Sequence, residues 1–192
     1  MSESEYAPPR TPGQGSSLRF RLRAATAGAH EQLDAVGAQF DLATPRGYAA
    51  FLSAHAALLP GIEAQLTRQP LPPDWPSRCR ASTLAVDLSS LGAGLPAAAA
   101  IPHLETAAMR VGALYVLEGS RLGGAVLLQR LRAMQPGVSC AFLSHGVGQS
   151  LWPRFVVWLD GLELDGTERE AAVEGARRTF DAFDLAFRCW AV

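Results

Sequence analysis

The chain has 192 residues, with 17 basic and 18 acidic side chains and a formal net charge of −1. This length suffices for one domain with a real core, and the near-zero charge gives no indication of a nucleic-acid or membrane-surface partner. No segment approaches the ~20 apolar residues of a membrane span, and the N-terminus lacks the apolar core of a signal peptide. Three widely separated cysteines favour reduced thiols. We therefore expect a cytoplasmic protein without a membrane partner.

Apolar residues recur every three to four positions along most of the chain, which predicts helices rather than strands. The expected fold class is all-α, with one helical domain over residues 16–192. The preceding residues 1–15 are polar and rich in proline and glycine, and we expect them to be disordered. The expected helices cover about 17–36, 44–68 with a bend at Pro60-Gly61, 80–90, 103–132, 147–162 and 166–190.

The expected helix 103–132 contains four glycines, in the stretch GALYVLEGSRLGG over residues 112–124. Each interior glycine costs a helix roughly 1 kcal/mol relative to alanine. At 100° per residue, Gly112, Gly119 and Gly123 fall on one stripe, with Tyr115 beside it. We expect this stripe to let a flat ligand approach the backbone, and the helix to bend or break at the glycines.

His30 lies at the edge of the apolar face of the first expected helix, and Gly28 and several alanines leave room around its ring. Arg23 precedes it by two turns, a distance of about 10 Å along the axis. A neutral imidazole is a good axial ligand for haem iron, and guanidinium pairs well with a carboxylate such as a haem propionate. The alternative is a half-buried histidine bonded to a backbone carbonyl.

Two motifs resemble the haem oxygenase family, particularly its bacterial branch. The segment RAATAGAHEQLD, residues 23–34, resembles the proximal helix, and LYVLEGSRLGG, residues 114–124, resembles the distal helix. They lie about 90 residues apart, as in the family, and the resemblance covers about 17–190. It implies a single all-α domain with haem between the proximal helix and a kinked distal helix. It leans towards the biliverdin-producing enzymes associated with bacterial phytochromes.

The resemblance also implies roles for four residues close to the haem iron. His30 would be the axial ligand, and the only protein ligand to the metal. Gly119 and Gly123 would let the distal backbone lie close over the haem face. Ser120 would stand where mammalian members have a catalytic aspartate, so that a neutral hydroxyl takes part in organising the distal water network. Catalysis is thus assigned to Gly119, Ser120 and Gly123.

Four further residues match positions at the rim of the family's haem pocket. Arg23 and Tyr115 match groups that bond the haem propionates. Arg177 and Phe180, on the last expected helix, lie where the family contributes a basic residue and an aromatic to the pocket. These contacts would hold the ring at one rotation and so select which meso carbon reacts.

The implied activity is the oxidative opening of haem b to biliverdin, with release of CO and ferrous iron. It uses O2 and electrons from an external donor, a ferredoxin or a flavoprotein reductase. The sequence contains no flavin, iron–sulfur or nicotinamide motif of its own. Biliverdin would serve either iron acquisition or a bilin-binding photoreceptor.

Several other interpretations compete with this one. A non-catalytic haem carrier or sensor would use the same scaffold, whereas in a purely structural protein Gly119-x-x-x-Gly123 would be a helix-packing motif. A thiaminase-type hydrolase would need Cys140 as a nucleophile. His55 and Glu118 could support the distal site, but we expect a core histidine and a solvated carboxylate, respectively.

Overall fold

The computed structural model describes residues 17–68 and 70–191, and within these ranges it contains helices and no strand, which confirms the all-α prediction. The first residues, including the segment predicted to be disordered, lie outside the described residues. The helices are α1 (Leu18–Gly37), α2 (Pro45–Ala56), α3 (Leu59–Gln65), α4 (Trp75–Arg78), α5 (Ala81–Ser90), α6 (Ala107–Met134), α7 (Ala141–Ser144), α8 (Leu151–Asp160) and α9 (Gly166–Trp190).

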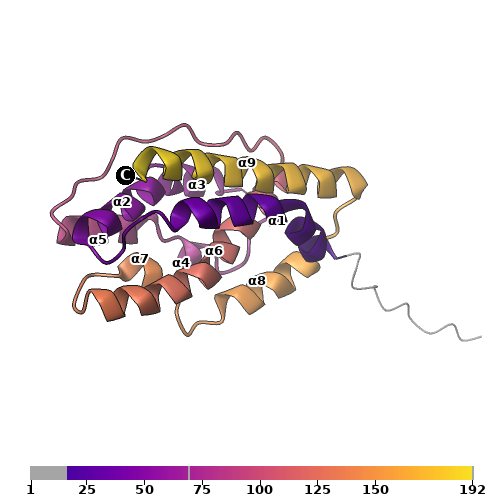
Figure 1. The fold of residues 1–192 in the computed structure, drawn as a ribbon. Coiled ribbons are helices and arrows are strands. Elements are labelled where there is room, and N and C mark those ends of the chain that lie inside the picture. Colours follow the sequence, from indigo (N-terminus) through magenta and orange to yellow (C-terminus); the bar gives the residue numbers. More distant parts are fainter. Residues whose placement is uncertain (1–16, 69, 192) are drawn as a thin grey trace, which may run out of the picture.

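Helix α9 is the central support of the fold, because α1, α2 and α6 all pack against it (Figure 1). The crossing of α6 and α9 is unusually close and depends on two glycines. A Cβ at Gly112 would overlap the carbonyl oxygen of Ala172, and a Cβ at Gly175 would overlap that of Met109. Gly112 is therefore needed for helix packing and does not face an open site, so its predicted place on the ligand-facing stripe is wrong.

The structure divides or shortens several of the expected helices. The expected helix 44–68 is two helices, α2 and α3, separated just before Pro60. The short helices α4 and α7 lie within expected loops. Helix α8 begins at Leu151 instead of residue 147, because Gly146, Gly148 and Ser150 have φ angles of 79°, 81° and 50°. Residues in the left-handed region interrupt a right-handed helical backbone, so α8 begins only after Ser150.

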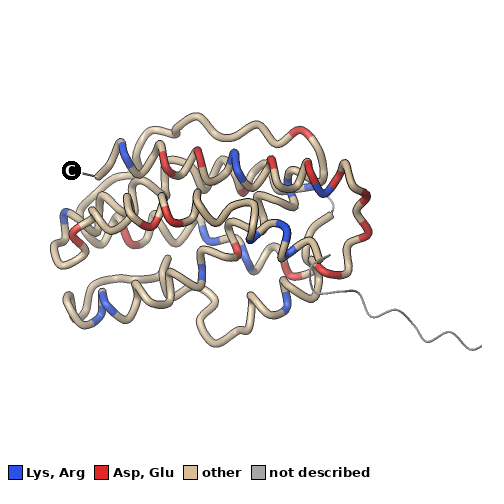
Figure 2. Tube along the Cα trace, turned by 45° about the vertical axis from the view of Figure 1, so that its right-hand side comes forward, with Lys and Arg blue, Asp and Glu red and all other residues tan. Residues whose placement is uncertain are grey.

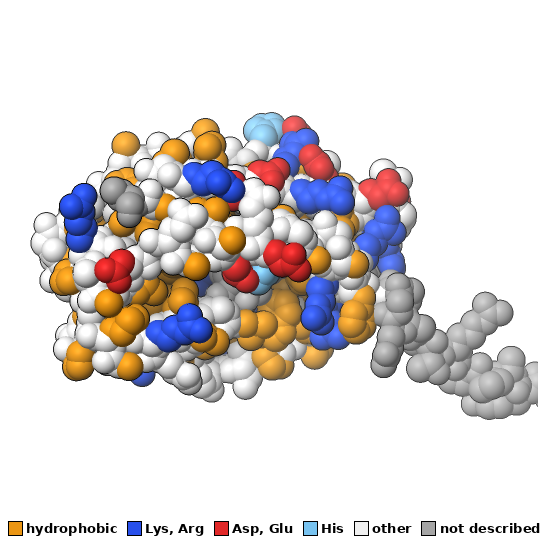
Figure 3. All heavy atoms as spheres, in the orientation of Figure 1, with side chains coloured by type: hydrophobic (Ala, Val, Ile, Leu, Met, Phe, Trp, Pro, Cys, Tyr) orange, Lys and Arg blue, Asp and Glu red, His pale blue; other side chains and the backbone are white. Residues whose placement is uncertain are grey.

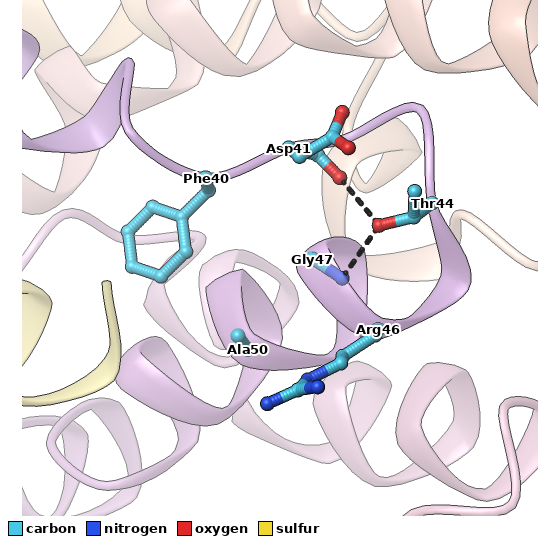
Figure 4. Close-up of a pocket in the computed structure, with 6 residues that line it drawn as sticks. All are labelled: Phe40, Asp41, Thr44, Arg46, Gly47 and Ala50. Carbon is cyan, nitrogen blue, oxygen red and sulfur yellow. Dashed lines mark hydrogen bonds between the residues drawn. The ribbon is translucent and has the colours of Figure 1, made fainter. Parts of the chain in front are cut away.

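The start of α2 is fixed by a side-chain cap (Figure 4). Thr44 Oγ1 accepts a hydrogen bond from Gly47 N at 3.1 Å and donates one to Asp41 O at 3.1 Å. A Cβ at Gly47 would overlap that same Asp41 oxygen. A small hollow beside this cap is lined by Phe40, Asp41, Thr44, Arg46, Gly47 and Ala50, none of which is a predicted site residue.

Helix α6 runs unbroken through all four glycines, so the glycines do not divide it. Among the described residues it is the one helix long and apolar enough, by length and composition, to cross a membrane. It packs against α7, α8 and α9, as the core helix of a folded domain does. Charges of both signs are spread over the surrounding helices (Figure 2), in agreement with the small net charge.

Candidate active site

His30 projects from α1 with 60% of its side chain exposed. Its Nδ1 lies 3.1 Å from Asp34 Oδ2, one turn later on the same helix, so the alternative of a bond to a backbone carbonyl is wrong. A carboxylate at Nδ1 favours the tautomer with the proton on Nδ1, which leaves the Nε2 lone pair available to a metal. The ring centroid lies 6.0 Å from that of Phe180 on α9. His30 therefore has the accessibility that an axial ligand needs.

The distal glycines on α6 face open space. Within the part of the chain that the structure describes, a Cβ at Gly123 would have no neighbour within 4 Å, and a Cβ at Gly119 would meet the rim of Trp152 at 3.8 Å. Leu122 and Val126, on the same part of α6, are 53% and 50% exposed. Protein packing thus does not require the glycines here, and exposed apolar side chains lie next to accessible backbone.

A hollow lined by hydrophobic side chains lies below α1 in the space-filling view, over the region of α6 and α8 (Figure 3). A porphyrin needs such an apolar slot, an axial base on one side and cations near its carboxylates. His30, the open backbone at Gly119 and Gly123, and the arginines of α1 supply these elements. The described residues therefore fit haem.

Tyr115 on α6 lies near two arginines of α1. Burial raises the pKa of its phenol, and the positive charges of Arg23 and Arg19 oppose that rise. Arg19 was not singled out in the sequence, although it lies one helical turn from Arg23. Two cations close to a phenol suit carboxylate groups.

The two predicted pocket residues of α9 also lie beside α1. Arg177 Nε donates to the carbonyl oxygen of Ala25 at 3.4 Å, and Phe180 is buried against the ring of His30. Arg177 thus helps to fix α1 on α9. Phe180 limits the movement of the His30 imidazole.

Ser120 is exposed, and its hydroxyl is held by Arg80, a residue not expected from the sequence to take part. Arg80 Nη2 donates to Ser120 Oγ at 2.5 Å and to Leu117 O at 3.2 Å, and Ser120 Oγ donates to Leu117 O at 2.7 Å. Arg80 is buried, with its guanidinium 4.8 Å from the centroid of Phe142. Arg80 lies at the very start of the expected helix 80–90, where the apolar periodicity gave no signal for it.

Glu118 is fully buried, so the prediction of a solvated carboxylate is wrong. Its two oxygens bind Arg78 Nη1 at 2.5 Å and Arg121 Nε at 3.1 Å. One signal in the sequence did point to this. Glu118 follows the buried Leu114 by four residues on α6, so both occupy the same helical face.

His55 is the core histidine that the sequence predicts. Nδ1 lies 2.9 Å from Phe51 O, and the ring lies within 6 Å of Phe51, Phe142, Phe183 and Phe187. Desolvation is the largest effect on this ring and lowers its pKa from 6.5 to about 4. Phe51 O opposes the shift, and Arg80 reinforces it.

His55 should make the haem-free protein less stable in mild acid. Because its pKa is about 4 when folded and 6.5 when unfolded, the unfolded chain binds a proton first as the pH falls. Stability should be lost between pH 6.5 and 4, on the order of 1–3 kcal/mol. Urea unfolding of wild type and His55→Gln across this range measures the difference. Parallel pH profiles for the two proteins would contradict the assignment.

Among the described residues, no three His, Cys, Asp or Glu side chains come together as a metal-ion site. A single imidazole such as His30 nevertheless suffices for haem iron, which the porphyrin itself holds.

Comparison with known proteins agrees with this geometry. A family profile described as Heme oxygenase matches residues 16–188. The chain belongs to the haem oxygenase family.

Two bacterial relatives resemble this haem oxygenase family member over most of their lengths. A heme oxygenase of Xanthomonas campestris pv. campestris is 37% identical over 142 residues, covering 71% of this chain and 86% of the relative. Heme oxygenase PigA of Pseudomonas aeruginosa is 29% identical over 182 residues, covering 89% and 92%. Family membership leaves a thiaminase-type reaction at Cys140 without support.

The fold is also similar to that of the NO- and CO-bound heme oxygenase from Neisseria meningitidis. The TM-score is 0.74 at 22% sequence identity, and the match covers 92% of each chain. This likeness confirms the predicted fold of the haem oxygenase family. The roles of individual residues in this member depend on its own geometry.

Proposed function

We propose that this enzyme opens haem b to biliverdin with release of CO and ferrous iron, using O2 and external electrons. The main support for the proposal is that α1 carries an accessible imidazole while the backbone of α6 is accessible at Gly123. His30 is exposed on α1 with its Nδ1 held by Asp34, and among the described residues nothing would lie within 4 Å of a Cβ at Gly123 on α6. In this proposal His30 Nε2 is the axial base, and Gly119 and Gly123 lie over the opposite haem face.

Haem supplies the redox chemistry, since its iron takes up electrons and O2 and its ring is the group that is oxidised. The protein must therefore orient the ring, restrict the distal side and bring protons to it. The Ser120 hydroxyl carries no charge, but Arg80 donates to it. A guanidinium has five N–H donors, more than the bonds of Arg80 to Leu117 O and Ser120 Oγ use. We assign the organisation of distal water to the pair Arg80 and Ser120.

The rim residues should determine which meso carbon reacts. Arg23 and Arg19 lie near Tyr115, and in this proposal the three residues bind the propionates. Arg177 and Phe180 keep α1 and the His30 ring in place. A ring held at both carboxylates presents one edge to the distal side.

Weakening the rim should therefore broaden the product distribution more than it slows the reaction. In Arg23→Gln/Tyr115→Phe we expect a mixture of biliverdin isomers where the wild type gives mainly one. The hemin affinity should fall by about tenfold, or about 1.4 kcal/mol, as expected for lost charge-assisted bonds. Chromatography of the products measures the isomers, and Arg130→Gln on exposed α6 surface serves as the control. An unchanged isomer pattern would place the propionates elsewhere.

An enzyme and a non-catalytic haem carrier are distinguished by adding a reductant. Both should bind one hemin and give a Soret band. With ascorbate in air, the enzyme should lose that band and yield biliverdin, identified by chromatography. A carrier would keep its haem intact, and that result would overturn the proposal.

The external donor is, in this proposal, a ferredoxin or a flavoprotein reductase, since the sequence carries no electron-transfer motif of its own. We place the enzyme in the cytoplasm, where such donors occur. Its biliverdin would then supply a bilin-binding photoreceptor, or the released iron would be the useful product.

A further inference from the structure

Glu118 is a fully buried carboxylate at the point where α6 meets the distal side of the site. We propose that Glu118 is a positioning residue: it ties α6 to Arg78 and Arg121, in the register that brings Ser120 to Arg80. This inference rests on the proposed function, because it concerns the arrangement of the distal side during haem oxidation. Glu118 itself need not touch haem.

Both oxygens of Glu118 are engaged by different arginines. Oε2 binds Arg78 Nη1 at 2.5 Å, and Oε1 binds Arg121 Nε at 3.1 Å. Arg121 also donates to Arg78 O, and its Nη1 lies 3.2 Å from His145 Nδ1. Burial lowers the pKa of His145, so the neutral ring accepts this bond. The carboxylate thus joins α6 to α4 and to the loop before α8.

Arg78 is a rigid anchor for this carboxylate. It is only 1% exposed, and Asp74 holds it in a two-point contact, Nε to Oδ1 at 2.5 Å and Nη2 to Oδ2 at 3.0 Å. Its Nη1 donates further to Leu151 O at 3.1 Å, at the start of α8. A guanidinium held between two carboxylates and a carbonyl has little freedom to follow a displaced α6.

Arg80 follows Arg78 by two residues, and its backbone N–H is held by Glu63. Glu63 accepts from Arg80 N at 2.9 Å and from Ala81 N at 3.2 Å. The Arg80 side chain then reaches Leu117 O and Ser120 Oγ. Glu118 lies between these two acceptors in the chain. Its bond to Arg78 therefore sets where both acceptors lie relative to Arg80.

The charges support the same role. Of the three guanidinium groups near Glu118, those of Arg78 and Arg121 bind carboxylates, whereas Arg80 donates to two neutral oxygens. Burial lowers the pKa of Arg80, Arg121 lowers it further, and Glu118 and Glu63 oppose both effects. Loss of the Glu118 charge would leave Arg121 less neutralised beside Arg80.

The test compares Glu118→Gln and Glu118→Asp with the wild type. Glutamine keeps the size of the side chain and removes its charge. Aspartate keeps the charge but is one methylene too short to reach both Arg78 and Arg121 at their present positions. The control is Glu174→Gln, which breaks the exposed pair between Glu174 and Arg178 Nε at 2.8 Å. Each protein is loaded with hemin, and three quantities are measured: hemin affinity, biliverdin formation rate, and the midpoint of the ferric complex's pH-dependent spectral transition.

For Glu118→Gln we expect a midpoint at least 0.5 pH unit lower, because losing a nearby negative charge favours the deprotonated form; this is on the order of a threefold change in the proton equilibrium. In both variants the biliverdin rate should fall about tenfold, with hemin affinity changed less than threefold. If Glu118→Gln does not fold, the biliverdin formation rate of Glu118→Asp tests the proposal instead.

A role in stability alone would lower the melting temperature and leave rate and midpoint as in the wild type, and this would overturn the inference. The proposed function fails separately, if the wild type binds hemin but forms no biliverdin. In that case the midpoint of the pH-dependent spectral transition still tests the positioning role of Glu118.

Discussion

Replacing His30 with alanine should remove the axial imidazole spectrum of the hemin complex and reduce biliverdin formation at least a hundredfold. The side chain is 60% exposed and its ion-pair partner, Asp34, is on its own helix, so the haem-free protein should keep its stability within about 0.5 kcal/mol. Loss of function without loss of stability distinguishes a ligand from a packing residue. Absorption spectroscopy and urea unfolding measure the two effects.

Two additions sharpen this experiment. Free imidazole should partly restore the spectrum of His30→Ala, because the truncated side chain leaves space for it. The matched control is His103→Ala, since His103 is 81% exposed and bonded to Glu105. We expect it to behave like the wild type. A wild-type spectrum in His30→Ala would assign the iron to another residue.

Alanine substitutions at two glycines of α6, Gly123 and Gly112, should change the stability of the haem-free protein in opposite directions. In Gly123→Ala the new methyl group meets none of the described residues within 4 Å, so the haem-free protein should gain about 1 kcal/mol from helix propensity. The same methyl group would stand in the space proposed for the haem face. Hemin affinity or turnover should then fall tenfold or more, and Gly123→Leu should lower it further.

Gly112→Ala on the same helix is the control. Its methyl group would overlap the backbone carbonyl of Ala172, which cannot move aside without shifting α9. Overpacking of this kind costs about 1–3 kcal/mol or more, so the melting temperature should fall. If Gly123→Ala bound and converted haem as the wild type does, the proposed contact of α6 with the haem would be wrong.

The apolar periodicity was enough to predict the longer helices, though not the short α4 and α7, since it records which faces are buried. It did not identify the neighbour on each face. Gly112 and Gly123 lie on one stripe of α6, yet one meets α9 and the other open space. Helical phase gives the direction of a residue from its own axis, whereas the partner depends on tertiary packing.

The polar support of the distal side could not be predicted from periodicity. Arg78 and Arg80 lie in and after the short helix α4, where prolines and turns hide any pattern. Their partners, Glu118 and Ser120, lie about 40 residues away in sequence. Glu118 on a buried face indicates that some cation must neutralise it, but only the fold determines which one.

The most direct test of the account is a crystal structure of the hemin complex. We expect His30 Nε2 to be bonded to the iron, Nδ1 still to contact Asp34, and the backbone of Gly119 and Gly123 to lie in van der Waals contact with the opposite haem face. The propionates should reach Arg23 and Tyr115. Haem bound through another histidine, or lying away from Gly119 and Gly123, would contradict the account.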